Sequence, residues 1–161
     1  MNIEIRTIQQ GDNKELASII RQTLKEFKAD KPGTVYYDEA TDHLSDLFSV
    51  NESAYFVAFI DGIMVGGAGI YPTDGLPDDT LELVKMYLLP KARGLGLGKK
   101  LILKCMETAA QNGYKKIYLE TMAELEKAVE TYSRLGFERL GAPLGNSGHH
   151  SCEIWMVKDI N

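Results

Sequence analysis

The stretch LLPKARGLGLGKK, residues 88–100, decides how this sequence is interpreted. Three glycines, Gly94, Gly96 and Gly98, alternate with larger residues between an apolar run and a pair of lysines. Glycine inside a regular element costs about 0.5–1 kcal/mol relative to alanine, so this spacing needs a physical reason. Close approach of the backbone to a ligand is one reason, and a tight turn with incidental surface lysines is the alternative.

The flanks of this stretch predict a strand before it and a helix after it. Residues 80–90, TLELVKMYLLP, are typical of a strand that ends at a proline. Apolar residues then recur at helical spacing from Leu97 to Ala109. The first amides of a helix are unpaired and carry the positive end of its dipole. Glycines before such a helix, with basic residues nearby, predict a phosphate site; the basic residues are Arg93, Lys99 and Lys100.

Two familiar nucleotide-binding patterns do not match. The Walker pattern fails because no glycine stands five residues before Gly98 and because Lys99 is followed by Lys100. The Rossmann pattern G-x-G-x-x-G fails because the glycines here are spaced G-x-G-x-G. A dinucleotide enzyme stays open as an alternative, since Glu120 lies near the position of a ribose-binding acid.

The remaining sequence alternates predicted strands and helices. Residues 2–8 read as a strand and a helix follows up to Phe27, whereas a second short helix is expected over residues 38–50. The Asp61-Gly62 pair between two β-rich runs is a strong hairpin signal. Thr121 and Glu124 predict a capping box for a helix over residues 125–135, and closing strands are expected over 137–141 and 151–160.

These elements predict one domain over residues 1–161, of α/β (α+β) class. Residues 81–120 form a β-α-β unit, so its two strands are expected to be parallel, with a right-handed crossover. The hairpin adds antiparallel strands and makes the sheet mixed.

Composition excludes several classes of protein. The chain has 161 residues, of which 44% are hydrophobic and 25% charged, as is ordinary for a soluble globular protein. A net charge of −5 without a long basic run argues against nucleic acid as a partner. The first residues lack the apolar core of a signal peptide and no long apolar span occurs, so we expect a cytoplasmic protein without membrane contact. Cys105 and Cys152 lack metal or redox spacing and are expected to be reduced thiols.

A second motif, AVETYSRLGF, occupies residues 128–137. Residues 93–98 resemble the acyl-CoA signature [RQ]-x-x-G-x-[GA] of the GNAT N-acetyltransferase superfamily, and residues 128–137 are similar to its A-x-x-x-Y-x-x-x-G-F segment. Leu125 departs from the pattern, because many members carry Asn there. The resemblance implies a mixed, mostly antiparallel seven-stranded sheet with a parallel pair, the fourth and fifth strands, at its centre and about four helices.

The same resemblance implies an enzyme that moves an acetyl group from acetyl-CoA, a co-substrate, to an amine without a metal. The backbone of Met86 and Leu88 would bind the pantetheine arm. Amides of the glycine stretch would hold the pyrophosphate, and its residues are Arg93, Gly94, Leu95, Gly96, Leu97, Gly98 and Lys99. Tyr132 matches the residue that donates a proton to the CoA sulfur; the alternative is a tyrosine packed in the core.

The sequence leaves more than one candidate for the general base that deprotonates the amine. Strand alternation places Glu82 on the row of Val84, Met86 and Leu88, where desolvation would raise its pKa toward a useful value. Some family members place a catalytic glutamate on this strand and others use a water, and an exposed acid is the alternative. His149 and His150 compete as a base or as walls of the acceptor pocket, unless they are simply solvated. No third ligand has suitable spacing, so the pair is not expected to bind a metal.

In this family the acceptor pocket is built by the segment after the first helix and by the loop before the last strand. Tyr36 and Tyr37 offer aromatic walls there, and the acids that follow suit an ammonium group. Cys152 is expected to be a pocket-wall thiol and not a nucleophile. The expected partner is a small-molecule amine, with no nucleic acid, and a homodimer is considered because dimers are common in the family. The rival to an enzyme is a regulatory module that binds acetyl-CoA without transfer.

Overall fold

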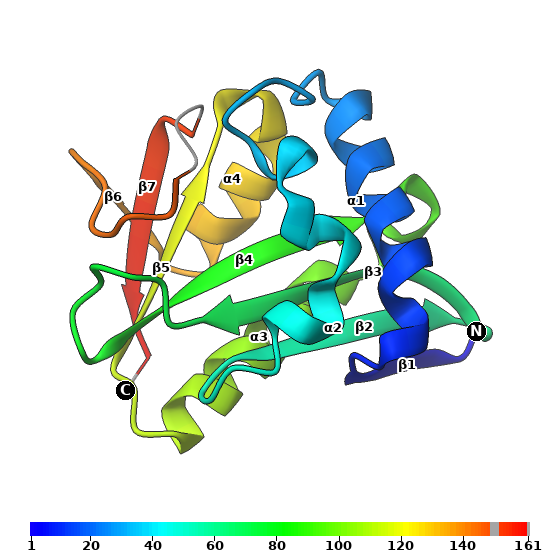
Figure 1. Cartoon of the computed structure of the whole chain (residues 1–161), viewed down its shortest axis with the longest axis horizontal. Helices are drawn as coiled ribbons and strands as arrows, with labels where there is room; N and C mark the ends of the chain where they lie inside the picture. Colours follow the sequence, from blue (N-terminus) through cyan, green and yellow to red (C-terminus); the bar gives the residue numbers. More distant parts are fainter. Residues whose placement is uncertain (149–151, 161) are drawn as a thin grey trace.

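The computed structural model describes residues 1–148 and 152–160, and a single mixed sheet runs through them (Figure 1). Its strand order is β1-β2-β3-β4-β5-β7-β6. The β4–β5 pair is parallel and the other neighbouring pairs are antiparallel, which confirms the predicted sheet. The strands are β1 Ile3–Thr7, β2 Ala54–Ile60, β3 Ile63–Tyr71, β4 Thr80–Leu88, β5 Lys116–Thr121, β6 Glu138–Leu140 and β7 Ile154–Asp159.

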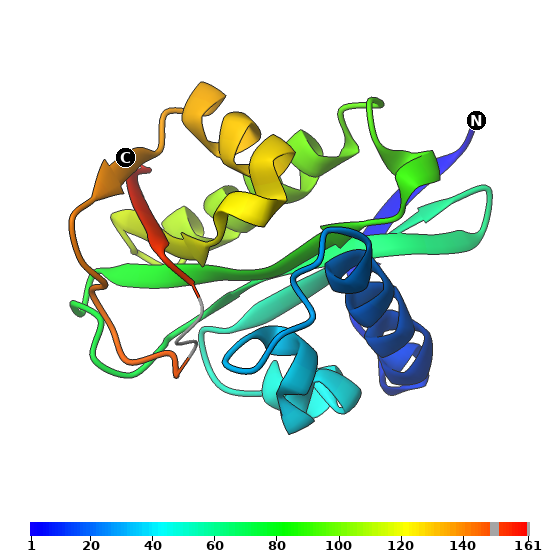
Figure 2. The same ribbon diagram turned by 90° about the horizontal axis from the view of Figure 1, so that it is seen from above.

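Helices cover both faces of the sheet, α1 and α2 on one side and α3 and α4 on the other (Figure 2). Each face has its own buried apolar core, one built on Leu16, Ile20 and Leu44 and the other on Leu97, Leu101 and Ile102. No helix in the described part of the chain is both long and apolar enough to cross a membrane. The helices are α1 Asn13–Glu26, α2 Leu44–Leu47, α3 Leu97–Gln111 and α4 Glu126–Arg134, with 3₁₀ turns η1 Gln10–Asp12, η2 Val35–Tyr37, η3 Glu39–Asp42, η4 Pro90–Ala92 and η5 Ala123–Leu125.

Two local predictions are wrong. The helix expected over residues 38–50 is divided into η3 and α2, because the buried Thr41 hydroxyl donates to the Val35 carbonyl (2.8 Å) and folds this segment back on itself. The predicted capping box is also absent. Thr121 is the last residue of β5, and the Glu124 carboxylate accepts a hydrogen bond from the Lys31 ammonium. Side-chain hydrogen bonds therefore outweigh the helix signal at both places.

A bulge in β4 changes which side chains share a face. Gly69 pairs with Val84 and Gly67 with Tyr87, so two residues of β4 lie opposite one residue of β3. Lys85 has a φ of 52°, and its carbonyl accepts a hydrogen bond from the buried Tyr55 hydroxyl (2.7 Å). The extra residue reverses the alternation beyond this point.

The prediction that Glu82 shares a face with Met86 and Leu88 is consequently wrong. Met86 and Leu88 pack against the core beneath α3 and α4, whereas Val84, two residues from Glu82, packs in the core beneath α1 and α2. Glu82 therefore lies on the α1 and α2 side of the sheet. A prediction that assumes strict alternation of side chains along the strand cannot reveal this bulge.

The two parallel strands part soon after they meet. Their pairing covers three positions and ends with Glu82 opposite Tyr118, although β4 continues to Leu88. The other edge of β5 stays paired with β7 as far as Thr121. The β4 and β5 ribbons diverge beyond this point (Figure 1). The backbone edges that face each other there do not pair with each other, so a ligand could bind to them.

We expect Gly67→Ala to destabilise the fold by about 1–3 kcal/mol, because the interior has no space for the added methyl group. A Cβ at this position would lie 2.5 Å from the Tyr55 ring and 2.6 Å from the Phe56 carbonyl oxygen. Urea denaturation of the variant and of the wild type measures the difference in free energy of unfolding.

Gly11→Ala is the matched control, since nothing lies within 4 Å of a Cβ there. Its stability should stay within about 0.5 kcal/mol of the wild type. Equal stabilities for the two variants would show that the close packing of β3 against Tyr55 has no energetic weight.

Candidate active site

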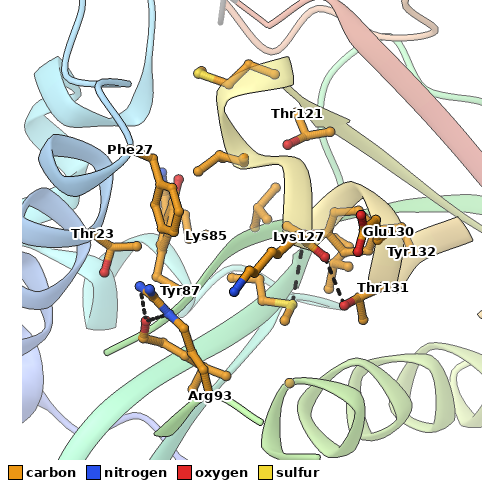
Figure 3. Close-up of a pocket in the computed structure, with 18 of the residues that line it drawn as sticks. Thr23, Phe27, Lys85, Tyr87, Arg93, Thr121, Lys127, Glu130, Thr131 and Tyr132 are labelled. Atoms are coloured by element: carbon orange, nitrogen blue, oxygen red, sulfur yellow. Dashed lines mark hydrogen bonds between the residues drawn. The ribbon is translucent and has the colours of Figure 1, made fainter. Parts of the chain in front are cut away.

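A cleft of about 710 Å³ lies where β4 and β5 separate. One wall comes from α1 and β4, with Thr23, Phe27, Lys85 and Tyr87, and the facing wall comes from α4 (Figure 3). The glycine turn and the start of α3 close one end, and the last residues of β5 with Cys152 line the other. A second, smaller hollow of about 290 Å³ shares Glu120 and Cys152 with this end.

The glycine turn presents open backbone to the cleft. Gly94 and Gly96 have φ values of 78° and 75°, a conformation that favours glycine, and no atom lies within 4 Å of a Cβ built on either. Gly96 is the N-cap of α3, and the Gly96 carbonyl accepts from the Lys100 amide (3.1 Å). The amides of Leu97, Gly98 and Lys99 thus have no acceptor within the helix. This geometry fits a phosphate group at the positive end of α3.

The Arg93 side chain has a different role from the one expected of a phosphate-binding arginine. Its guanidinium donates to the Leu88 carbonyl (2.9 and 3.1 Å) and to the Glu26 carboxylate (2.6 and 2.9 Å). It also lies 4.9 Å from the centre of the Phe27 ring. The hydrogen bond from Arg93 lowers the pKa of the Glu26 carboxyl. Arg93 thereby ties the glycine turn to the end of β4 and to α1.

Tyr132 projects from α4 toward β4. Its side chain is nearly buried, with 6% exposed, and its ring meets Phe137 edge to face at 5.8 Å between centroids. The hydroxyl lies 3.9 Å from the Met86 sulfur, which is a weak acceptor. Burial raises the pKa of the Tyr132 phenol well above its usual value. The phenol therefore stays protonated at neutral pH and can act as a donor.

Two buried or half-buried carboxylates lie near the far end of the cleft. Glu82 is 3% exposed and accepts a hydrogen bond from the Thr73 hydroxyl (2.5 Å). Glu120 accepts from the hydroxyls of Tyr118 (2.7 Å) and Ser147 (2.5 Å), so it joins β5 to the loop before β7. Of the two, Glu82 stands on β4 itself, on the face toward α1 and α2.

Lys85 is a cleft residue that sequence reasoning missed. Its side chain is 5% exposed, and its ammonium lies 3.7 Å from the Asp38 carboxylate. Burial lowers the pKa of Lys85, and the charges of Asp38 and Glu82 partly offset this effect. A lysine inside a largely apolar strand run was the available signal. Only the bulge explains why this lysine reaches the cleft.

The structure gathers most of the predicted residues in one place. Those that line the cleft are Glu82, Met86, Leu88, Arg93, Gly94, Gly96, Leu97, Gly98, Lys99 and Tyr132. Leu95 lies at the outer side of the turn, 39% exposed. Tyr36 and Tyr37 lie in η2 with their rings 5.1 Å apart, whereas their neighbours Thr34 and Val35 line the cleft. His149 and His150 are outside the described residues.

The remaining candidates concern Cys152 and metals. Cys152 lines the cleft, and burial, helped by the charge of Glu120, raises the pKa of its thiol to about 12. A thiol that stays protonated at neutral pH is a poor nucleophile. Within residues 1–148 and 152–160, no group of three His, Cys, Asp or Glu side chains is arranged to hold a metal ion.

Comparisons with known proteins agree with this geometry. Residues 16–137 match the Acetyltransferase (GNAT) family. The chain is 43% identical over 158 residues to the uncharacterized N-acetyltransferase YjgM of Escherichia coli strain K12, covering 97% of this chain and 94% of that protein.

Solved structures share the fold. A GNAT-family acetyltransferase from Staphylococcus aureus Mu50 superposes with a TM-score of 0.84 at 20% identity, over 99% of this chain and 100% of that one. The PaiA N-acetyltransferase of Thermoplasma acidophilum, in complex with coenzyme A, has a TM-score of 0.75 at 20% identity, over 99% of each chain.

Proposed function

Because the chain belongs to the Acetyltransferase (GNAT) family, as its two sequence motifs predicted, we propose that it moves an acetyl group from acetyl-CoA to a primary amine of a small-molecule or amino-acid-like acceptor. It is an acyltransferase by family. The observation that carries the proposal is the cleft between β4 and β5, with the open glycine turn at one end and the Tyr132 hydroxyl facing β4.

The donor half of the proposal assigns acetyl-CoA to this cleft. The amides at the start of α3 would hold the pyrophosphate, and the open backbone edge of Met86 and Leu88 would bind the pantetheine arm. The Leu88 carbonyl already accepts from Arg93, so the Leu88 amide is the group that we assign to the ligand. The PaiA relative was solved with coenzyme A, which supports this assignment.

The chemistry needs a nucleophilic amine and a stabilised leaving thiolate. The amine nitrogen attacks the acetyl carbon, the C–S bond breaks, and Tyr132 donates its phenolic proton to the sulfur. A phenol that burial keeps protonated is suited to this step. Glu82 accepts a proton from the amine, either directly or through a water, from the side of the sheet toward α1 and α2.

The acceptor half rests on charge and position. Asp38, Glu82 and Glu120 put negative charge around the far end of the cleft, which suits an ammonium group. Tyr36, Tyr37, His149 and His150 stay predicted acceptor contacts. A homodimer, a cytoplasmic location and a single domain over the whole chain also remain predictions from the sequence.

A module that binds acetyl-CoA without transfer is the alternative, and it is distinguished by turnover. Incubation of the wild type with acetyl-CoA and a panel of primary amines should release free CoA thiol for at least one amine.

We expect Tyr132→Phe to lower kcat by about 10²–10⁴-fold with little change in KM for acetyl-CoA, because the acid acts on the leaving group. Tight CoA binding without thiol release for any amine would support the module, and equal rates would make Tyr132 structural.

We expect Gly96→Glu to weaken CoA binding by more than tenfold. The residue has a φ of 75°, which is unfavourable for a side chain, and a carboxylate there would occupy the phosphate site. Isothermal titration with CoA measures the change, and NAD serves as the ligand that should not bind the wild type. Retained affinity in the variant would contradict the phosphate assignment.

We expect Glu82→Gln to remove one ionisation from the acidic limb of the kcat/KM profile against pH. The amide keeps the size of the side chain and can still bond to the Thr73 hydroxyl. An unchanged profile would move the base to a histidine or a water.

A further inference from the structure

The proposed function leaves the Lys85 ammonium without a role, although burying such a charge is costly. Lys85 lies at the bulge of β4, lines the cleft and is 92% buried, since 8% of it is exposed. The N–O distance of its ion pair with Asp38 is 3.7 Å, longer than a direct hydrogen bond. A buried ammonium has three donors to satisfy. A ligand in the cleft with an acceptor group would complete its surroundings.

The position of Lys85 is fixed by the fold and not by Asp38. The Tyr55 hydroxyl donates a hydrogen bond to the Lys85 carbonyl, and Tyr55 itself is fully buried. The side chain of Asp38, by contrast, is 35% exposed in the segment between η2 and η3. Because Lys85 itself lines the cleft, a ligand group in the cleft can approach its ammonium.

Lys85 has two acidic residues near it. Its ammonium lies 3.7 Å from the Asp38 carboxylate, and the charges of both Asp38 and Glu82 act on it, so this part of the cleft offers one cation and two anions. An amine without an acidic group would pair with the carboxylates but would offer no acceptor to the Lys85 ammonium. A diamine would bring a second cation against Lys85. An amine that also carries a carboxylate matches both signs.

We propose that Lys85 binds the carboxylate of the acceptor, so that this enzyme acetylates amines that bear a carboxylate close to the amino group, as amino acids do. The inference rests on the proposed function and narrows its acceptor to one chemical class. Glu82 and Asp38 face the ammonium end of the same molecule. The charge-assisted contact replaces a long ion pair by a direct one.

The first test measures binding and does not need turnover. N-acetylated amino acids keep the carboxylate and have lost the ammonium, and their amides have lost both charges. In the presence of saturating CoA, we expect the acids of such a panel to bind the wild type at least tenfold more tightly than the matched amides by isothermal titration. In Lys85→Met the ratio should fall to about one.

The second test uses transfer. Amino acids and their amides serve as matched acceptors in the CoA-release assay. Lys85→Met should raise KM about tenfold or more for the acids and leave KM for the amides unchanged, without altering CoA affinity. Lys14→Met is the control, since Lys14 is exposed on α1 and does not line the cleft, and it should change neither value.

The outcomes separate the two proposals. Acids and amides that bind equally to the wild type, or a preference that survives Lys85→Met, would overturn the role of Lys85 whether or not transfer occurs. Transfer to amides and diamines as readily as to amino acids would overturn it as well. CoA binding without transfer to any acceptor would count against the proposed function alone. If Lys85→Met does not fold by thermal melting, Lys85→Gln replaces it in both tests.

Discussion

The separation of β4 from β5 is the constraint on which the rest of this structure depends. After Glu82 meets Tyr118 the two parallel strands no longer pair, and β4 goes on for six residues beside a cleft. Backbone groups at an unpaired strand edge need partners. An extended ligand with amide groups can supply them, and the glycine turn at the end of β4 can hold the phosphate end of the same ligand.

The bulge at Lys85 decides how the two sides of this cleft differ. It turns Met86 and Leu88 toward α3 and α4, beneath Tyr132, and leaves Glu82 on the side of α1 and α2. In the mechanism that we propose, the proton donor Tyr132 and the proton acceptor Glu82 would therefore approach the reacting atoms from opposite sides of the sheet. The same bulge places the buried Lys85 in the cleft, so the charge selectivity that we propose depends on the geometry of this strand.

Much of the fold could be read from local signals. Asp61-Gly62 marks a hairpin whose strands end at Ile60 and begin at Ile63, and the glycine stretch gives the start of α3. The predicted capping box failed because the Lys31 ammonium binds the Glu124 carboxylate. The helix over residues 38–50 failed because the Thr41 hydroxyl binds the Val35 carbonyl. Side-chain hydrogen bonds compete with helix formation in ways that periodicity does not reveal.

The sequence by itself determined the family and singled out the glycine turn and Tyr132, because these depend on short motifs whose residues are close together in the chain. Only the tertiary structure decided the face of Glu82, the tie between Arg93 and Glu26, and the place of Lys85 beside Asp38. One extra residue in β4, held by Tyr55 from a distant strand, reverses the alternation. That reversal depends on a long-range contact, and no local pattern contains it.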